Sequence, residues 1–111
     1  MRRVDEAVRE VLGDAVNQDL KDPRVGFVTV TEVRTSADLR QARVYVSVFG
    51  TEAEQVATLE GLASAHGILQ ARLARELRMK RTPTLEFALD DTAIRAARLE
   101  ALIEEVTEDE G

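Results

Sequence analysis

The sequence predicts a single α+β domain from its length, its apolar content and the order of its helical and strand patterns. The chain has 111 residues, 44% of them hydrophobic, which is enough for one core in a domain of ordinary size. Its patterns follow the order α-β-β-α-α-β and end with an additional C-terminal helix. The simplest arrangement of these elements is a three-stranded sheet with helices on one face.

The first half of the chain predicts one helix and a pair of strands. Apolar residues recur every three or four positions over about residues 2–20, which is typical of a helix, and Pro23 ends this pattern. Two stretches rich in β-branched residues, at about 25–33 and 43–49, predict strands. The polar stretch 34–40 between them is short enough for an antiparallel hairpin loop.

Two consecutive helices are predicted next. Thr51 and Glu54 have the spacing of a capping box at the start of the first helix, which extends to about residue 64. Gly67 interrupts the apolar pattern, and the second helix continues to about Lys80. We expect both helices to bury apolar residues that include Val56, Leu59, Leu62, Ala63, Ile68, Leu69, Leu73 and Leu77.

The last strand is predicted at about residues 85–89 and the last helix at about 93–106. The pair Asp90-Asp91 fits helix capping better than a catalytic carboxylate pair, because adjacent residues at the end of a strand point apart. The acidic tail 107–111 is predicted to be disordered, which leaves one domain over residues 1–106. We expect the last helix to bury Ile94, Leu99, Leu102 and Ile103.

Composition excludes several classes of protein. The chain has no cysteine, so disulfides, zinc-thiolate sites and thiol nucleophiles are absent, and the composition fits a reducing cytoplasm. No stretch approaches the ~18 consecutive apolar residues of a membrane span, and the amino terminus is charged at once, unlike a secretory signal. With one histidine and no glycine-rich phosphate loop, a hydrolase is a distant third hypothesis.

Charge is distributed unevenly along the chain. The net charge is −6, but residues 1–81 hold 13 basic and 12 acidic side chains, whereas residues 82–111 hold 2 and 9. The densest positive segment is 72–81, with five basic residues and one acid. The three-residue spacing of its first arginines predicts one solvated stripe on a helix. The candidates for phosphate contact in this segment are Arg72, Arg75, Arg78, Lys80 and Arg81.

Local strings add a family resemblance to this pattern, and their serial order is more specific than any one of them. The order of elements is that of the type II KH fold. The strings are Asp22-Pro23-Arg24, Val28-Thr29-Val30-Thr31-Glu32-Val33, Ser36-Ala37-Asp38-Leu39, Ala42-Arg43-Val44-Tyr45-Val46-Ser47, Ala65-His66-Gly67 and Pro83-Thr84-Leu85-Glu86-Phe87. Over about residues 2–103 the chain resembles the ribosome-binding factor A family.

The resemblance implies a function that composition does not show. Members of that family bind the free small (30S) ribosomal subunit, contact 16S ribosomal RNA and assist late subunit maturation and rRNA processing, in bacteria especially in the cold. The resemblance therefore implies a cytoplasmic, monomeric RNA-binding assembly factor with no cofactor, no metal and no reaction of its own. Small-subunit ribosomal proteins are further candidate partners.

The resemblance also implies a role for Ala65, His66 and Gly67, which match the Ala-x-Gly kink that replaces the Gly-x-x-Gly loop of typical KH domains. His66 is either an exposed or partly packed hinge residue, or a side chain that stacks on a base or donates to a phosphate. Two departures from the family pattern are Gln70 and Lys80, where family members often have arginine.

Further candidates for RNA contact lie outside the basic segment. They are the terminal pair and the arginines on or near the predicted hairpin: Arg2, Arg3, Arg34, Arg40 and Arg43. Arg24 is expected to serve the turn after the first helix by pairing with a carboxylate. The alternative function is a protein–protein module of the same shape, for which a net charge of −6 is natural. The tail could likewise repel non-cognate RNA or contact a basic ribosomal protein.

Overall fold

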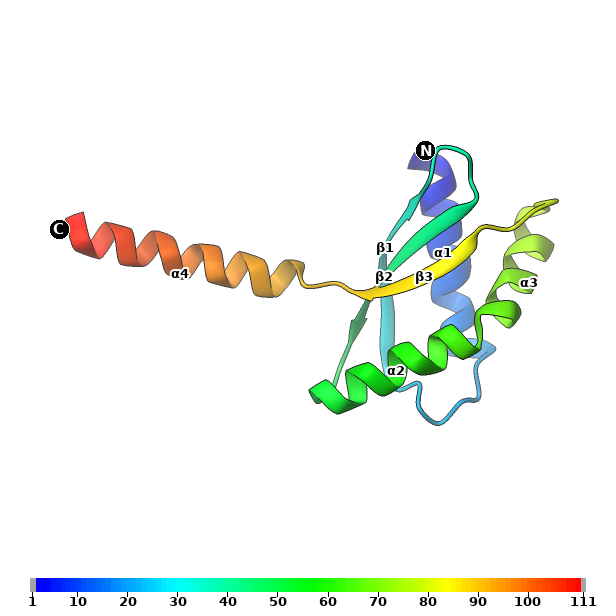
Figure 1. The fold of residues 1–111 in the computed structure, drawn as a ribbon, viewed down its shortest axis with the longest axis horizontal. Coiled ribbons are helices and arrows are strands. Elements are labelled where there is room, and N and C mark those ends of the chain that lie inside the picture. The colour runs from blue at the N-terminus through cyan, green and yellow to red at the C-terminus, as the bar shows by residue number, and fades with distance from the viewer. Residues whose placement is uncertain (1, 111) are drawn as a thin grey trace.

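The structure is a computed structural model that describes residues 2–110, without the side chains at positions 2, 93, 94 and 105–110. Figure 1 shows a sheet and three helices packed together, with a fourth helix projecting away from them. The elements follow the predicted order: α1 (Arg2–Gln18), β1 (Val28–Thr35), β2 (Gln41–Val48), α2 (Glu52–Ser64), α3 (His66–Leu77), β3 (Thr84–Leu89) and α4 (Thr92–Glu110). The α+β fold class is therefore confirmed.

The sheet has the strand order β1-β2-β3, which places β2 in the centre. β1 and β2 form an antiparallel hairpin, whereas β3 returns parallel to β2 after the crossover through α2 and α3. Val44 and Val46 on the central strand are fully buried. Their neighbours Arg43, Tyr45 and Ser47 point to the other face, which the helices leave open.

The core lies between that covered face and the helices α1, α2 and α3. α1 contributes apolar residues at helical spacing, and α3 contributes Leu69 and Leu73, both fully buried. Leu62 is the fully buried leucine of α2. The buried residues of the cluster are Val8, Val11, Leu12, Ala15, Val16, Val28, Val30, Val33, Ala42, Val44, Val46, Val48, Leu62, Leu69, Leu73 and Leu85.

A β-bulge in β1 explains why the apolar pattern of that strand alternates less regularly than that of β2. The register with β2 shifts between Val30 and Glu32, so Thr31 is the additional residue. The bulge allows Val28, Val30 and Val33 all to enter the core despite the odd spacing between the last two. It also directs the Thr31 hydroxyl toward Asp90, to whose Oδ2 it donates at 2.6 Å.

The segment before β1 is held against α2 as well as by its own turn. Arg24 pairs with Asp22 at 2.6 Å, as predicted, and this lowers the pKa of the Asp22 carboxyl to about 2. The buried hydroxyl of Thr58 in α2 donates to the Arg24 carbonyl at 3.1 Å. Close packing here requires Gly61, because a Cβ atom at that position would lie 2.7 Å from Val25 Cγ2.

Two helix glycines are expected to respond in opposite ways to replacement by alanine. Gly61→Ala should destabilise the fold by about 1–3 kcal/mol, because the added methyl group overlaps Val25. Gly13→Ala in α1 should stabilise it by about 0.5–1 kcal/mol, because an added Cβ would meet nothing within 4 Å and alanine favours the helix. Urea unfolding of both variants measures the two changes. Equal effects would contradict the packing described for these helices.

The capping box at α2 is confirmed, while several other local predictions are wrong. Thr51 Oγ1 accepts from the Glu54 N–H at 3.2 Å, and the Glu54 carboxylate accepts from the Thr51 N–H at 3.3 Å. α1 ends at Gln18 rather than near residue 20, and α3 ends at Leu77 rather than near Lys80. The predicted burial of three apolar side chains is also wrong, because Ala63 is exposed and the exposed fraction is 54% at Val56 and 53% at Ile68.

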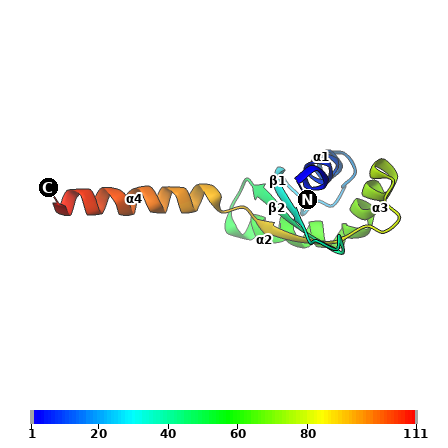
Figure 2. The same ribbon diagram turned by 90° about the horizontal axis from the view of Figure 1, so that it is seen from above.

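The last helix differs most from its prediction. Leu99, Leu102 and Ile103 are 56–59% exposed rather than buried, and the side chain of Ile94 lies outside the described residues. The physical reason is the direction of α4, which leaves the end of β3 and runs away from the sheet in both views (Figures 1 and 2). The helix continues to Glu110, past the predicted boundary at residue 106, so the separate tail at 107–111 stays a prediction.

The Asp90 carboxylate links the start of α4 to β1 through hydrogen bonds. One carboxylate oxygen accepts from the Thr31 hydroxyl at 2.6 Å, and the other accepts from the Thr92 N–H at 2.9 Å. These donors stabilise the ionised form and lower the pKa of the Asp90 carboxyl to about 2, with the Thr31 hydroxyl contributing most. Asp90 thus has the capping role that the sequence predicted.

Acid should loosen this junction in a defined pH window. Because the folded pKa of Asp90 lies near 2, below its ordinary value of 3.8, the ionised carboxylate stabilises the fold above pH 4. That contribution should decline as the pH falls from about 4 to about 2. An NMR titration of the Asp90 carboxyl carbon should give a midpoint near 2, raised in Thr31→Val. The same midpoint in both proteins would contradict the assigned cause.

Candidate RNA-binding surface

The junction between α2 and α3 is the first candidate contact region. The chain breaks its helical path at Ala65, whose backbone angles are φ −90° and ψ 6°, rather than at Gly67 as predicted. The Ala65 N–H donates to the carbonyls of Gly61 and Leu62, both at 3.1 Å, so the last turn of α2 is satisfied internally. Gly67 is the second residue of α3 and does not adopt a positive φ.

The three predicted junction residues do not face the same way. The Ala65 side chain is buried, with 7% exposure, whereas His66 and Gly67 are exposed in the first turn of α3. A Cβ atom on Gly67 would meet nothing within 4 Å, so an incoming backbone can approach the helix closely there. Ile68 extends this exposed surface. The prediction that Ile68 is buried is wrong. The four-residue spacing of Leu69 and Leu73 defines the buried face of α3, and Ile68 lies off that face.

The prediction that Arg72 belongs to a solvated stripe is wrong, because this side chain makes contacts inside the fold. Its side chain is only 13% exposed and lies between two carboxylates. Its guanidinium donates to Asp19 just after α1 at 2.8 Å and to Glu76 one turn along α3 at 2.5 Å. The hydrogen bonds that Arg72 donates to Glu76 and Asp19, with Glu76 contributing most, raise the pKa of the guanidinium above its ordinary value. Arg72 therefore ties α3 to α1 and is withdrawn as a phosphate ligand.

Arg78 also leaves the predicted stripe, but in a different way. It caps α3 in the left-handed conformation, with φ 53° and ψ 41°, and so begins the loop that leads to β3. A non-glycine residue in this region carries about 1–2 kcal/mol of steric cost. Gln70, the neutral departure in α3, donates to the Pro83 carbonyl at 2.8 Å and holds the other end of that loop.

Four exposed cations gather around this helix end, and we call them the basic cluster: Arg75, Arg78, Lys80 and Arg81. Within the described part of the chain, none of these four has an ion pair. Glu76, the one acid of the segment, is already paired with Arg72 at 2.5 Å. The positive charge of the cluster is therefore available to an external anion.

The hairpin loop lies beside the start of β3, three residues after Arg81. Gln41 at the start of β2 is the register partner of Thr84 at the start of β3, and the Thr84 N–H donates to the Arg40 carbonyl at 2.8 Å. The Arg40 side chain is 69% exposed and only 3.9 Å from Asp38, which is a weak surface pair. The fold thus places Arg40 at the same end of the sheet as Arg81.

The other two hairpin arginines are engaged on the open face of the sheet. Arg34 pairs with Glu32 at 2.9 Å and lies 5.9 Å from the centre of the Tyr45 ring. Arg43 pairs with Glu86 across to β3 at 3.4 Å. Each arginine thus has an acid beside it, so this face carries little net positive charge. Arg34 and Arg43 are weaker candidates than the sequence suggested.

The terminal arginines lie at the start of α1, where the Asp5 carboxylate accepts from the Thr35 N–H at 3.0 Å and holds the helix against the hairpin. Arg3 is exposed in the first turn of α1, and no ion pair involves it among residues 2–110. The side chain of Arg2 lies outside the described residues. The structure therefore gathers Arg75, Arg78, Lys80 and Arg81 at the end of α3. It places Arg40 and Arg3 with the hairpin, and it leaves His66 and Gly67 at the opposite end of α3.

Comparison with known proteins identifies the family. The sequence model described as ribosome-binding factor A matches residues 1–103. The chain belongs to this family. The crystal structure of ribosome-binding factor A from Thermus thermophilus is 36% identical, with 79% of this chain and 92% of that chain covered and a TM-score of 0.71.

Two further ribosome-binding factor A structures agree in fold. A solution NMR structure of the Thermotoga maritima protein assigned to this family is 35% identical, covering 78% of this chain and 83% of that chain, with a TM-score of 0.71. A homology model of Thermus thermophilus ribosome-binding factor A, fitted into the cryo-EM map of its complex with the 30S subunit, is 37% identical, covering 78% of this chain and 90% of that chain, with a TM-score of 0.66. The order of elements in this chain, α-β-β-α-α-β-α with a three-stranded sheet, matches that of these structures.

Two kinds of feature were not found in the described part of the chain. No helix within residues 2–110 is long and apolar enough to cross a membrane. In the same residues, no three side chains from histidine, aspartate and glutamate are grouped so that they could hold a metal ion. The family is one of ribosome-binding factors.

Proposed function

We propose that this chain binds the free 30S ribosomal subunit through 16S ribosomal RNA and assists late maturation of the subunit and processing of its rRNA. The observation that carries the proposal is the basic cluster, four cations without ion pairs in the described structure, at the end of α3 in a protein whose net charge is −6. Membership of the ribosome-binding factor A family supplies the ribosomal partner. The expected setting is the cytoplasm, and the expected state is a monomer.

The chemistry of the cluster suits phosphate. Arginine and lysine neutralise phosphates and release condensed counterions, so affinity should decrease steeply as salt increases. Arg78 strengthens the case, because a strained left-handed conformation is more commonly kept at functional sites than elsewhere. Glycine would fit that position with less strain, but it would remove one of the four charges.

The junction residues supply a second contact on the same helix. α3 has 12 residues, so His66 and the basic cluster are separated by about 18 Å along the helix. We propose that rRNA runs along α3, with phosphates near the cluster and a backbone approach at Gly67. His66 is then positioned to donate to a phosphate or to stack on a base.

The mechanism is binding rather than chemistry. A ligand shifts a conformational equilibrium only by the difference between its affinities for the two states. We propose that the chain binds an immature 30S conformation more tightly than the mature one, and so favours the folding path that leads to processed rRNA. Small-subunit ribosomal proteins beside that rRNA are further expected contacts. Cold conditions are those in which the effect of this assistance should be largest.

Co-sedimentation tests the proposal directly. The full chain should sediment with purified free 30S subunits but much less with whole ribosomes, and the bound fraction should decrease as salt is raised from about 50 to about 200 mM. Bound rRNA should be detected by crosslinking to α3. Equal binding to both particles, or binding that does not respond to salt, would favour a protein–protein module and overturn the proposal.

A further inference from the structure

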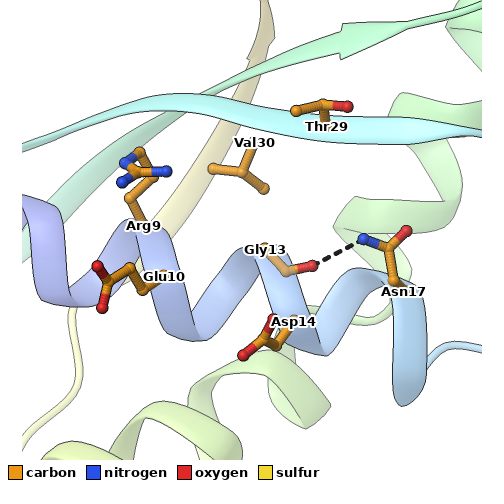
Figure 3. Close-up of a pocket in the computed structure, with 7 residues that line it drawn as sticks. All are labelled: Arg9, Glu10, Gly13, Asp14, Asn17, Thr29 and Val30. Atoms are coloured by element: carbon orange, nitrogen blue, oxygen red, sulfur yellow. Dashed lines mark hydrogen bonds between the residues drawn. The ribbon is translucent and has the colours of Figure 1, made fainter.

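A groove between α1 and the free edge of β1 lies apart from the basic cluster and has no role in the proposed function. It has a volume of about 410 Å³ and is lined by Arg9, Glu10, Gly13, Asp14, Asn17, Thr29 and Val30. Figure 3 shows α1 running alongside β1, with Arg9, Gly13 and Asn17 on the side of the helix next to the strand. Glu10 and Asp14 form its outer rim.

The strand edge in this groove offers unused main-chain hydrogen-bonding groups. The Phe49 N–H donates to the Phe27 carbonyl at 3.2 Å, which makes this a hydrogen-bonded pair of the antiparallel hairpin. Because such pairs alternate, Thr29 bonds to β2 while Val28 and Val30 direct their N–H and C=O groups outward. No bond from these outward groups is present among residues 2–110. An exposed edge of this kind can pair with another extended chain.

Gly13 makes room beside that edge at a cost to the helix. A Cβ atom there would meet nothing within 4 Å, so no packing inside the described chain requires glycine. The Asn17 side-chain amide donates to the Gly13 carbonyl at 3.0 Å, which holds the Asn17 side chain in place one turn along α1 (Figure 3). The missing side chain thus leaves space for a segment that lies between α1 and the strand edge.

The charges along the groove indicate which kind of extended chain could bind there. Arg9 pairs with Glu6 at 2.9 Å, whereas neither Glu10 nor Asp14 has an ion pair within residues 2–110. These two carboxylates are four residues apart on α1, a rise of about 6 Å. Alternate residues of an extended strand are separated by about 6.8 Å. Basic side chains two residues apart on a strand therefore match the two carboxylates, whereas RNA phosphates would be repelled.

We propose that this groove binds an extended basic peptide of a partner protein, which adds a strand to β1 and places lysine or arginine at alternate positions against Glu10 and Asp14. Main-chain bonds to Val28 and Val30 hold the peptide, and the two carboxylates select its charge. The site is independent of the proposed contact between the basic cluster and rRNA.

The probe is a peptide of four Lys-Val repeats, compared with a Glu-Val repeat and with a Lys-Pro repeat that cannot form a strand ladder. NMR of the full chain should show that the Lys-Val peptide shifts the Val28 and Val30 amides and slows their hydrogen exchange. Binding should be at least tenfold tighter than for either comparison peptide. Equal binding of Lys-Pro, or shifts confined to other residues, would overturn the proposal. Shifts of these amides by an rRNA oligonucleotide would assign the groove to nucleic acid instead.

Variants separate the groove from general charge effects. Glu10→Lys with Asp14→Lys should reverse the preference from Lys-Val to Glu-Val, while the matched pair Glu60→Lys and Glu100→Lys, remote from the groove, should not. Gly13→Gln should weaken Lys-Val binding at least tenfold with no loss of thermal stability and unchanged rRNA binding, because the added side chain only fills the groove. Retention of full peptide affinity in Gly13→Gln would contradict the assigned site.

Discussion

Replacement of Arg75, Arg78, Lys80 and Arg81 by glutamate is expected to abolish binding to free 30S subunits while the fold remains intact. The four side chains are exposed and have no ion pairs in the described structure, so their removal breaks no internal contact. A charge-assisted contact contributes about 1.5 kcal/mol or more, so the loss of only two corresponds to about a hundredfold in Kd. Sedimentation at fixed salt measures the loss, and circular dichroism checks the fold.

Two controls distinguish lost contacts from general repulsion. The same four positions changed to glutamine remove the cations without adding negative charge, and should still weaken binding strongly. Arg95→Glu with Arg98→Glu adds negative charge on α4, away from the basic cluster, and should weaken binding much less. If the glutamine variant bound as wild type, the cluster would not be the rRNA contact.

Arg72 and Arg75 lie three residues apart on α3, yet opposite effects are expected when each is changed to glutamine. Arg72→Gln should lower the midpoint of thermal unfolding by several degrees, because Asp19 and Glu76 lose the guanidinium that they share. Arg75→Gln should leave stability unchanged and weaken rRNA binding, since its side chain is exposed and unpaired in the described residues.

The measurement is a thermal melt and an rRNA titration on both variants. For Arg72→Gln, rRNA affinity should stay near wild type at temperatures where the variant is folded. A stable Arg72→Gln with a large loss of affinity would show that the guanidinium reaches RNA in spite of its ion pairs. A destabilised Arg75→Gln would show an internal role for Arg75.

The difference between these arginines also shows where sequence reasoning reaches its limit. Helical spacing correctly placed Arg72 and Arg75 on one helix, but it wrongly assigned Arg72 to the same solvated face as Arg75. The partner of Arg72 is Asp19, 53 residues earlier in the chain, and no local pattern indicates such a pair. Capping signals are local, by contrast, so Thr51, Glu54 and Asp90 were predicted in the roles that they have.

The end of α3 and the position of α4 were missed for related reasons. Polar and apolar residues continue with helical spacing to Lys80, and only the loop path to β3 requires Arg78 to turn left-handed. The apolar residues of α4 have helical spacing too, but spacing does not say whether a partner surface exists within the chain. Exposure above half at Leu99 and Leu102 shows that no surface of the described structure covers them.

The salt dependence of rRNA binding tests the central claim most directly. A plot of log K against log salt concentration should have a steep negative slope for the wild-type chain. Each phosphate neutralised on single-stranded RNA contributes about −0.7 to that slope. For the variant with glutamine at Arg75, Arg78, Lys80 and Arg81, the account predicts a slope shallower by about 3. An unchanged slope in that variant would contradict the account, because the phosphate contacts would then come from other residues.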